Sequence, residues 1–162
     1  MNKAVPARTI FSSPVHFLAF GFGSGLAPWA PGTAGTLVAV FLEWPLRSQG
    51  FEVRLLVAVL LFASGVWICG ESSRRLGVHD HGGIVWDEIA GYFLTMLLAP
   101  SGWLWSALGF ILFRLFDIFK PWPIREIDHR LGGGLGIMVD DTVAGVFAGL
   151  ILWGLVQLHL FT

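Results

Sequence analysis

The chain has 162 residues, of which 55% are hydrophobic and 13% charged, with a mean hydropathy of +0.73 and a formal net charge of -1. This length fits a single domain over residues 1–162, and the apolar excess indicates a membrane protein, with a soluble helical bundle of unusually apolar core as the alternative. The near-neutral charge excludes a basic surface for nucleic acid. The lone Cys69 excludes an internal disulfide scaffold.

Five apolar runs predict helices, and a short apolar stretch at 15–22 precedes them. The runs cover 33–46, 53–70, 84–99, 103–119 and 139–161. A helix that crosses a bilayer needs about 20 residues. The sequence therefore predicts an all-α membrane bundle with about four to five apolar helices, and the stretch 15–22 is expected to lie at the interface.

The distribution of Lys and Arg between these runs predicts an orientation. Alternate connections place seven of these residues on one side and two, Arg47 and Arg54, on the other. The positive-inside rule then puts the N-terminus, 71–83 and 120–138 in the cytoplasm. The polar motifs fall at the cytoplasmic helix ends and are expected to converge on one site. Tryptophans near the run ends fit an interfacial belt.

The first motif, Pro-Gly-Thr-Ala-Gly-Thr at 31–36, begins the first long run. Free backbone N–H groups at a helix start favour an anion such as phosphate. This makes Thr33, Gly35 and Thr36 candidate phosphate-binding residues. A helix cap with flexible glycines is the alternative interpretation.

A second motif occurs twice: Val-x-Asp-x-x-Ala-Gly at 85–91 matches 139–145 position for position. In a helix each Gly lies one turn past its Asp on the same face, where the missing side chain lets a neighbouring helix come close. Glu88 and Asp140 stand beside the matched residues Asp87 and Asp141. The alternative is that both segments are helix first turns, where acids suit the positive end of the dipole.

The third motif, at 113–123, ends the fourth run. Arg114, Asp117 and Lys120 recur every third residue and so share a helix face, which ends at Pro121. They predict an intrahelical ladder of ion pairs, or a site in which Asp117 contacts a metal and Lys120 contacts phosphate. The two interpretations are compatible.

Acids outnumber bases in these motifs. Five carboxylates stand against the cations Arg114 and Lys120, which leaves three negative charges; the acids are Asp87, Glu88, Asp117, Asp140 and Asp141. An ionised Asp inside a spanning helix costs roughly 2.5 to 3.5 kcal/mol, so a partner is expected. A hard divalent cation such as Mg²⁺ prefers carboxylate oxygen and commonly bridges protein acids to phosphate.

These motifs, in this order, resemble the phosphatidylglycerophosphatase A family from about His16 to the last helix. The signatures here are Pro31-Gly32-Thr33-x-Gly35-Thr36, His79-Asp80-His81-Gly82 with Val85-Trp86-Asp87-Glu88, Phe113-Arg114-x-x-Asp117-x-x-Lys120-Pro121-Trp122-Pro123, and Gly136 to Gly145 around Asp140 and Asp141. The resemblance implies an all-helical, Mg²⁺-dependent phosphatase. It would remove the terminal phosphate of phosphatidylglycerophosphate to give phosphatidylglycerol.

Each acidic or basic motif residue receives a predicted role. The predicted catalytic residues are Asp87, Asp117, Asp141, His79 and Asp80. The predicted phosphate-binding residues are Thr33, Gly35, Thr36, Lys120 and Arg125. The predicted ligands of one or two Mg²⁺ ions are Asp87, Glu88, Asp140 and Asp141. An alternative chemistry makes an Asp the nucleophile through an aspartyl phosphate.

The resemblance implies a protein of the bacterial inner membrane that acts on a lipid, and the apolar runs with the Lys and Arg distribution predict a multi-pass protein whose site faces the cytoplasm. A function from another class is also open. Intramembrane acids and a repeated motif also mark ion or solute transporters. The position of the acids at helix ends, not at the membrane midplane, argues for the phosphatase.

Overall fold

The computed structural model describes residues 5–78, 81–122, 124, 126 and 131–158, and all regular structure in these residues is helical. The elements are α1 (Ala7–Phe11), α2 (Pro14–Ala19), η1 (Gly21–Leu26), α3 (Pro31–Glu43), η2 (Trp44–Leu46), α4 (Phe51–Leu76), α5 (Trp86–Thr95), α6 (Trp103–Phe119) and α8 (Gly133–Gln157). The all-α prediction is confirmed for this part of the chain.

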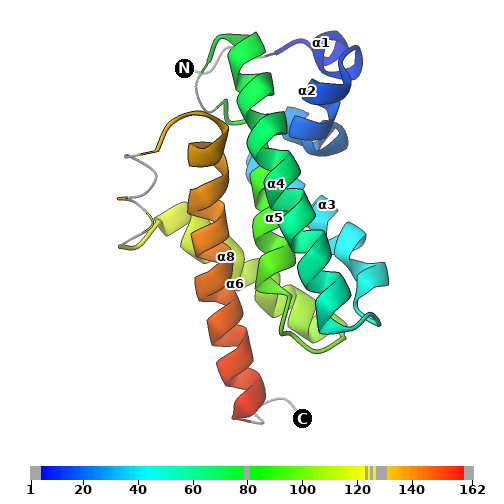
Figure 1. Ribbon diagram of the computed structural model, residues 1–162, viewed down its shortest axis with the longest axis vertical. Helices are drawn as coiled ribbons and strands as arrows, with labels where there is room; N and C mark the ends of the chain where they lie inside the picture. The colour runs from blue at the N-terminus through cyan, green and yellow to red at the C-terminus, as the bar shows by residue number, and fades with distance from the viewer. Residues whose placement is uncertain (1–4, 79–80, 123, 125, 127–130, 159–162) are drawn as a thin grey trace.

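The short helix α5 lies at the centre of the bundle. It packs against α3, α4, α6 and α8, and Figure 1 shows it between α4 and α8. Ile89 and Tyr92 of α5 are fully buried. Because α5 is enclosed on several sides, the acids in its first turn are brought against neighbouring helices and not against solvent.

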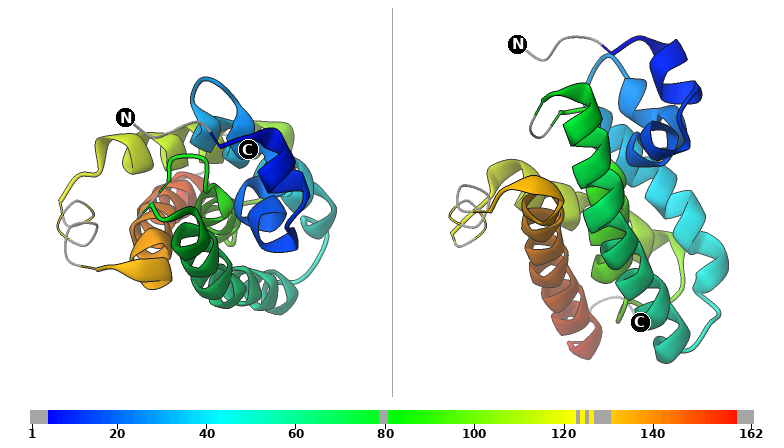
Figure 2. Two further views of the ribbon diagram at one scale, coloured as in Figure 1. Left: turned by 90° about the horizontal axis from the view of Figure 1, so that it is seen from above. Right: turned by 45° about the horizontal axis from the view of Figure 1, so that its top comes forward.

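The helices α4 and α8 approach each other at the upper end of Figure 1 and diverge below it, with α5 between them. Gly134, near the start of α8, makes the approach possible: a Cβ at this position would overlap the carbonyl oxygen of Val66 in α4. The N-terminal helices α1 and α2 lie beside the upper end of α4 (Figure 2). The buried His16 ring of α2 forms a 2.8 Å hydrogen bond with the Ser72 hydroxyl of α4.

The expectation of four to five membrane-crossing helices is wrong for the described residues. Only α4 and α8, with 26 and 25 residues, are long and apolar enough to cross. The apolar runs that became α3, α5 and α6 form helices of 13, 10 and 17 residues, below the roughly 20 required. Pro45 follows the end of α3 and Pro121 follows the end of α6, so proline limits these two helices where composition alone suggested longer ones. The helix α5 ends at Thr95, well before Pro100.

The last apolar run also begins earlier than expected. The helix α8 starts at Gly133, whereas the run was expected from residue 139, so Asp140 and Asp141 lie in its third turn, with no acid in the first. The interpretation of this pair as first-turn acids that favour the helix dipole is therefore wrong. For Asp87 and Glu88, which do lie in the first turn of α5, it is correct.

Candidate active site

Three carboxylates from α5 and α8 form a cluster, here called the acid cluster: Asp87, Glu88 and Asp141. One ligand oxygen from each lies within 4.8 Å of those from the other two. Two come from the first turn of α5 and one from the third turn of α8. The repeated motif thus brings its two matched Asp residues to one place.

The glycines of the same motif explain this close approach. A Cβ on Gly145 would overlap the carbonyl oxygen of Gly91, and one on Gly91 would lie 2.8 Å from the carbonyl oxygen of Asp141. The α5 and α8 backbones are therefore in direct contact one turn beyond the matched Asp residues. This confirms the sequence-based prediction that each Gly admits a neighbouring helix.

The acid cluster is buried and rich in unused acceptors. Asp87 is 8% exposed and Asp141 is 3% exposed. Asp87 Oδ1, Glu88 Oε2 and Asp141 Oδ2 are buried with no hydrogen-bond donor among the described residues. Burial first, and nearby negative charge second, raise the pKa of the Asp87 carboxyl well above its ordinary value, and burial likewise raises the pKa of Glu88. A cation held by these oxygens would favour the ionised carboxylates, so the donor set fits a hard divalent ion.

A guanidinium group borders the acid cluster. Arg114 of α6 forms an ion pair with Asp117 on the next turn and lies 3.7 Å from Glu88 Oε1 of α5. The Arg114–Asp117 contact confirms one of the ion pairs predicted along this helix. The contact with Glu88 was not predicted, because helical spacing reveals neighbours on one helix and says nothing about which foreign helix faces them.

Lys120 does not continue the ladder. It ends α6 with a left-handed backbone (φ 41°), and its Nζ lies 2.6 Å from Asp140 Oδ2 of α8. Asp140 therefore holds Lys120 beside the acid cluster. Of the four predicted Mg²⁺ ligands, three form the acid cluster, and Asp140 is directed to Lys120.

The start of α3 also reaches the acid cluster. A Cβ on Gly32 would overlap Glu88 Oε1, so the N-terminal backbone of α3 lies against that carboxylate. The predicted phosphate-binding residue Thr36 is fully buried and donates its hydroxyl hydrogen bond to the Gly32 carbonyl oxygen at 2.9 Å. Thr33 and Gly35 lie in the same two turns, and a Cβ on Gly35 would meet the Val85 side chain. A convergence of α3, α5, α6 and α8 was predicted from the motifs, and the contacts of their described residues are in accord with it.

His79, Asp80 and Arg125 lie outside the described residues, so their predicted roles stay predictions. His81 is buried, accepts a 3.0 Å hydrogen bond at Nδ1 from the Gly83 backbone N–H, and contacts the Phe20 ring. This places the loop before α5 against η1 and the end of α2.

The fold and the site define a membrane-associated helical protein whose buried carboxylates are suited to a divalent cation. The sequence profile of phosphatidylglycerophosphatase A matches residues 17–156. The chain belongs to this family, which is a family of phosphoric monoester hydrolases.

Individual relatives agree with the family match. A phosphatidylglycerophosphatase A of Escherichia coli (strain K12) is 46% identical over 155 residues, covering 91% of this chain and 86% of the relative. The protein of the same name from Haemophilus influenzae is 44% identical over 158 residues, covering 96% and 97%. A Bacteroides thetaiotaomicron relative, provisionally named a phosphatidylinositol-3-phosphatase, is 36% identical over 141 residues, covering 82% and 87%. No solved structure matches the chain.

Proposed function

We propose that the protein hydrolyses the terminal phosphomonoester of phosphatidylglycerophosphate, releasing phosphate and phosphatidylglycerol, with Mg²⁺ held by Asp87, Glu88 and Asp141. The observation that carries the proposal is the acid cluster, in which three buried carboxylates from two helices offer oxygens within 4.8 Å of one another. The names of the two relatives above 40% identity support the substrate. The transporter alternative is not favoured, because the family is one of hydrolases.

In this reaction a water oxygen forms a bond to phosphorus, the ester P–O bond breaks, and the departing glycerol oxygen takes up a proton. A cation held by Asp87, Glu88 and Asp141 would supply Lewis-acid polarisation of the phosphate and would help to activate water. Lys120 donates charge-assisted hydrogen bonds to phosphoryl oxygens from its position on Asp140. Arg114 holds Asp117 and Glu88 in place across α6 and α5. Phosphoryl transfer depends mainly on such positioning and electrostatics.

The site is proposed to face the cytoplasm. The acid-cluster end of the bundle carries Arg74 and Arg75 in the last turn of α4, together with Lys120. At the opposite end, Arg47 and Arg54 are paired with Glu43. Under the positive-inside rule the first end is cytoplasmic. In intact cells an impermeant maleimide should label Ser48→Cys and leave Arg74→Cys unlabelled; the reverse pattern contradicts this orientation.

The deciding experiment measures phosphate release from phosphatidylglycerophosphate in detergent micelles, with Mg²⁺ and with a chelator, for wild type and Asp141→Asn. The variant should lose more than about 100-fold in rate, because loss of a ligand should exceed the 10- to 100-fold typical of an outer-sphere partner. Glu71→Gln is the matched control. It also removes a carboxylate, but one at the end of α4 that pairs with Arg74 and Arg75 outside the acid cluster.

Each component of the proposal can fail separately. Full activity of Asp141→Asn would contradict the acid cluster as the site. Undiminished wild-type activity in chelator would contradict the proposed dependence on Mg²⁺. Faster release from phosphatidylinositol 3-phosphate than from phosphatidylglycerophosphate would contradict the substrate. Labelled phosphate trapped on the protein in acid would favour an aspartyl phosphate over direct attack by water.

A further inference from the structure

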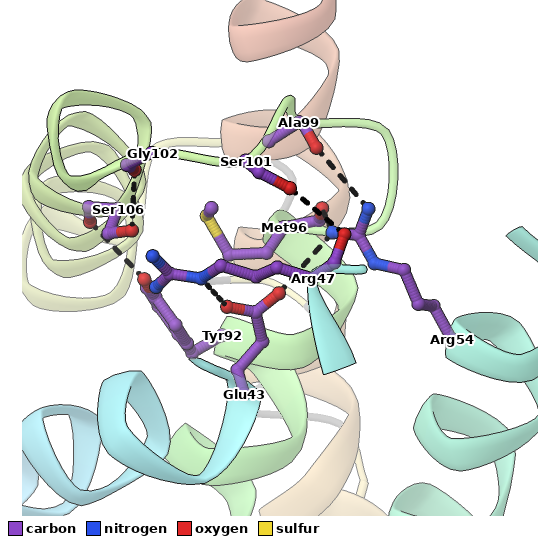
Figure 3. Close-up of polar contacts among 9 residues, drawn as sticks. All are labelled: Glu43, Arg47, Arg54, Tyr92, Met96, Ala99, Ser101, Gly102 and Ser106. Carbon is purple, nitrogen blue, oxygen red and sulfur yellow. Dashed lines mark hydrogen bonds and ion pairs between the residues drawn. The ribbon is translucent and has the colours of Figure 1, made fainter. Parts of the chain in front are cut away.

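A second charged cluster lies at the end of the bundle opposite the acid cluster. It consists of Glu43, Arg47 and Arg54 and is here called the arginine cluster (Figure 3). Arg47 Nε donates to Glu43 Oε2 at 2.7 Å, and Arg54 Nη2 lies 3.4 Å from Glu43 Oε1. Arg54 also donates to the carbonyl oxygens of Met96 and Ala99. The arginine cluster therefore links the end of α3, the start of α4 and the turn after α5.

The arginine cluster has an excess of positive charge. One carboxylate, on Glu43, which is 2% exposed, stands against two guanidinium groups. Glu52, the next acid along the chain, is exposed to solvent. Arg47 is 8% exposed, and its terminal nitrogens Nη1 and Nη2 are buried beside the neutral Tyr92 hydroxyl, with no charged acceptor among the described residues (Figure 3). Buried charged donors without a charged acceptor are costly, so this guanidinium is suited to receive an anion.

A hollow of about 490 Å³ lies beside Arg47. It is lined by Trp44, Pro45, Arg47, Ser48, Ser101 and Gly102. The guanidinium carbon of Arg47 lies 3.9 Å from the centre of the Trp44 ring, which stacks on Trp103 at 3.8 Å. Ser101 donates to the Arg47 carbonyl oxygen at 2.9 Å and so ties the two walls together. The half-exposed tryptophan pair is typical of a membrane interface.

An apolar groove lies between α3 and α6, and its lining residue Trp103 stacks on Trp44 of the hollow. Its volume is about 430 Å³, and it is lined by Leu37, Val40, Trp103, Ser106, Ala107, Phe110 and Ile111. Leu37 and Ile111 are 48% and 52% exposed. The groove begins near the arginine cluster and follows both helices toward the middle of the bundle. An anion site that continues into an apolar groove matches the two parts of a phospholipid.

We propose that the arginine cluster and this groove bind one anionic phospholipid, with its phosphate at Arg47 and an acyl chain between α3 and α6. The ligand is distinct from the substrate, because the acid cluster lies at the other end of the same helices. A free phosphate would share the contacts with Arg47 but would make no use of the groove. The proposal does not depend on the proposed enzymatic reaction.

The test is native mass spectrometry and thermal unfolding of the purified protein in neutral detergent with added phosphatidylserine, phosphatidylcholine or inorganic phosphate. Phosphatidylserine is chosen because it is an anionic diester and not a product of the proposed reaction. Wild type should retain one phosphatidylserine in preference to phosphatidylcholine and unfold a few degrees higher with it, because a ligand that binds only the folded state stabilises it. Arg47→Lys should weaken this binding about tenfold, because it keeps the charge but loses the planar fork and the stacking on Trp44.

Two further variants separate the proposal from a folding defect. Ile111→Trp fills the groove without touching the arginine cluster and should reduce lipid retention. Arg74→Gln removes an exposed arginine at the opposite end of α4 and should leave retention unchanged. Equal retention of phosphatidylserine by wild type, Arg47→Lys and Ile111→Trp would overturn the proposal. Stabilisation of wild type by inorganic phosphate equal to that by phosphatidylserine would overturn the assignment to a lipid.

Discussion

The two ends of the bundle bury charge in opposite ways. At the acid cluster, carboxylates from α5 and α8 face one another, and their unused oxygens are suited to a cation. At the arginine cluster, two guanidinium groups share the Glu43 carboxylate, and the unused donors of Arg47 are suited to an anion. An unmatched buried charge is costly, and the sign of the mismatch indicates the class of ligand that each end could hold.

The largest expected effect is a loss of activity without a loss of stability, in a variant of the acid cluster. Asp87→Asn should reduce phosphate release by more than about 100-fold, because it removes one oxygen donor of the acid cluster. Without added divalent ions it should leave the melting temperature unchanged or raise it, because three clustered carboxylates repel one another.

Glu43→Gln should lower the stability of the protein and leave its activity unchanged. It leaves Arg47 and Arg54 buried without a carboxylate and should destabilise the protein by about 3–5 kcal/mol. Activity per folded molecule should persist, because Glu43 lies far from the acid cluster along α3. Chemical denaturation and rate assays on both variants test the contrast. A stable Glu43→Gln protein would show that the arginine cluster is not a structural link.

The close contact of α5 and α8 can be tested by comparing two glycine substitutions, both in α8. Gly145→Ala should cost about 1–3 kcal/mol, because its Cβ overlaps the Gly91 carbonyl oxygen, and should also lower activity by moving Asp141 away from Asp87. Gly154→Ala, also in α8, meets no atom within 4 Å and should be neutral or stabilising by up to about 1 kcal/mol. Equal stabilities of the two variants would contradict the role of the glycine contact.

Lys120 tests whether the acid cluster needs its neighbouring cation. Lys120→Gln should raise KM about tenfold or more, because a hydrogen bond to a charged group contributes roughly 1.5–3 kcal/mol. Arg75→Gln is the control, since this arginine pairs with Glu71 at the end of α4. An unchanged KM in Lys120→Gln would place phosphate recognition elsewhere.

The smallest effect concerns the N-terminal helices beside the acid-cluster end. Burial first, then the positive charge of Arg75, lower the pKa of His16 below its ordinary 6.5, against an opposing contribution from Glu71. Below pH 6.5 the unfolded chain takes up a proton that folded His16 resists, so stability present at neutral pH should decline as the pH falls. Melting temperatures from pH 7.5 to 5.5 should fall more steeply in wild type than in His16→Gln. Parallel curves would contradict this role.

Much of the acid cluster could be predicted from the chain alone. The repeated Val-x-Asp-x-x-Ala-Gly segment predicted both the matched Asp residues and the helix contact at Gly91 and Gly145, because local spacing determines which residues share a helix face. Arg114 and Asp117 were predicted to pair for the same reason. Asp140 was predicted to be a metal ligand, and in the structure its carboxylate contacts Lys120. Adjacent residues of a helix point about 100° apart, so Asp140 and Asp141 face different neighbours.

The arginine cluster could not be predicted in this way. In the sequence Arg47 and Arg54 were counted only as positive residues of a connection, and the carbonyl oxygens that Arg54 meets, on Met96 and Ala99, are more than 40 residues away. Glu43 and Arg47 are four residues apart and can pair locally, but no local pattern links Arg54 to these carbonyl oxygens. Only the packing of α3, α4 and α5 brings them together.

The sequence by itself determined the helical class, the family and the residues of the acid cluster, because apolar periodicity, proline positions and motif spacing act within one helix or its ends. The tertiary structure alone decided which partner each acid faces and that a positive cluster lies at the far end. These features depend on which helices pack together and where each stops. Burial and charge matching are properties of that packing and not of any single segment.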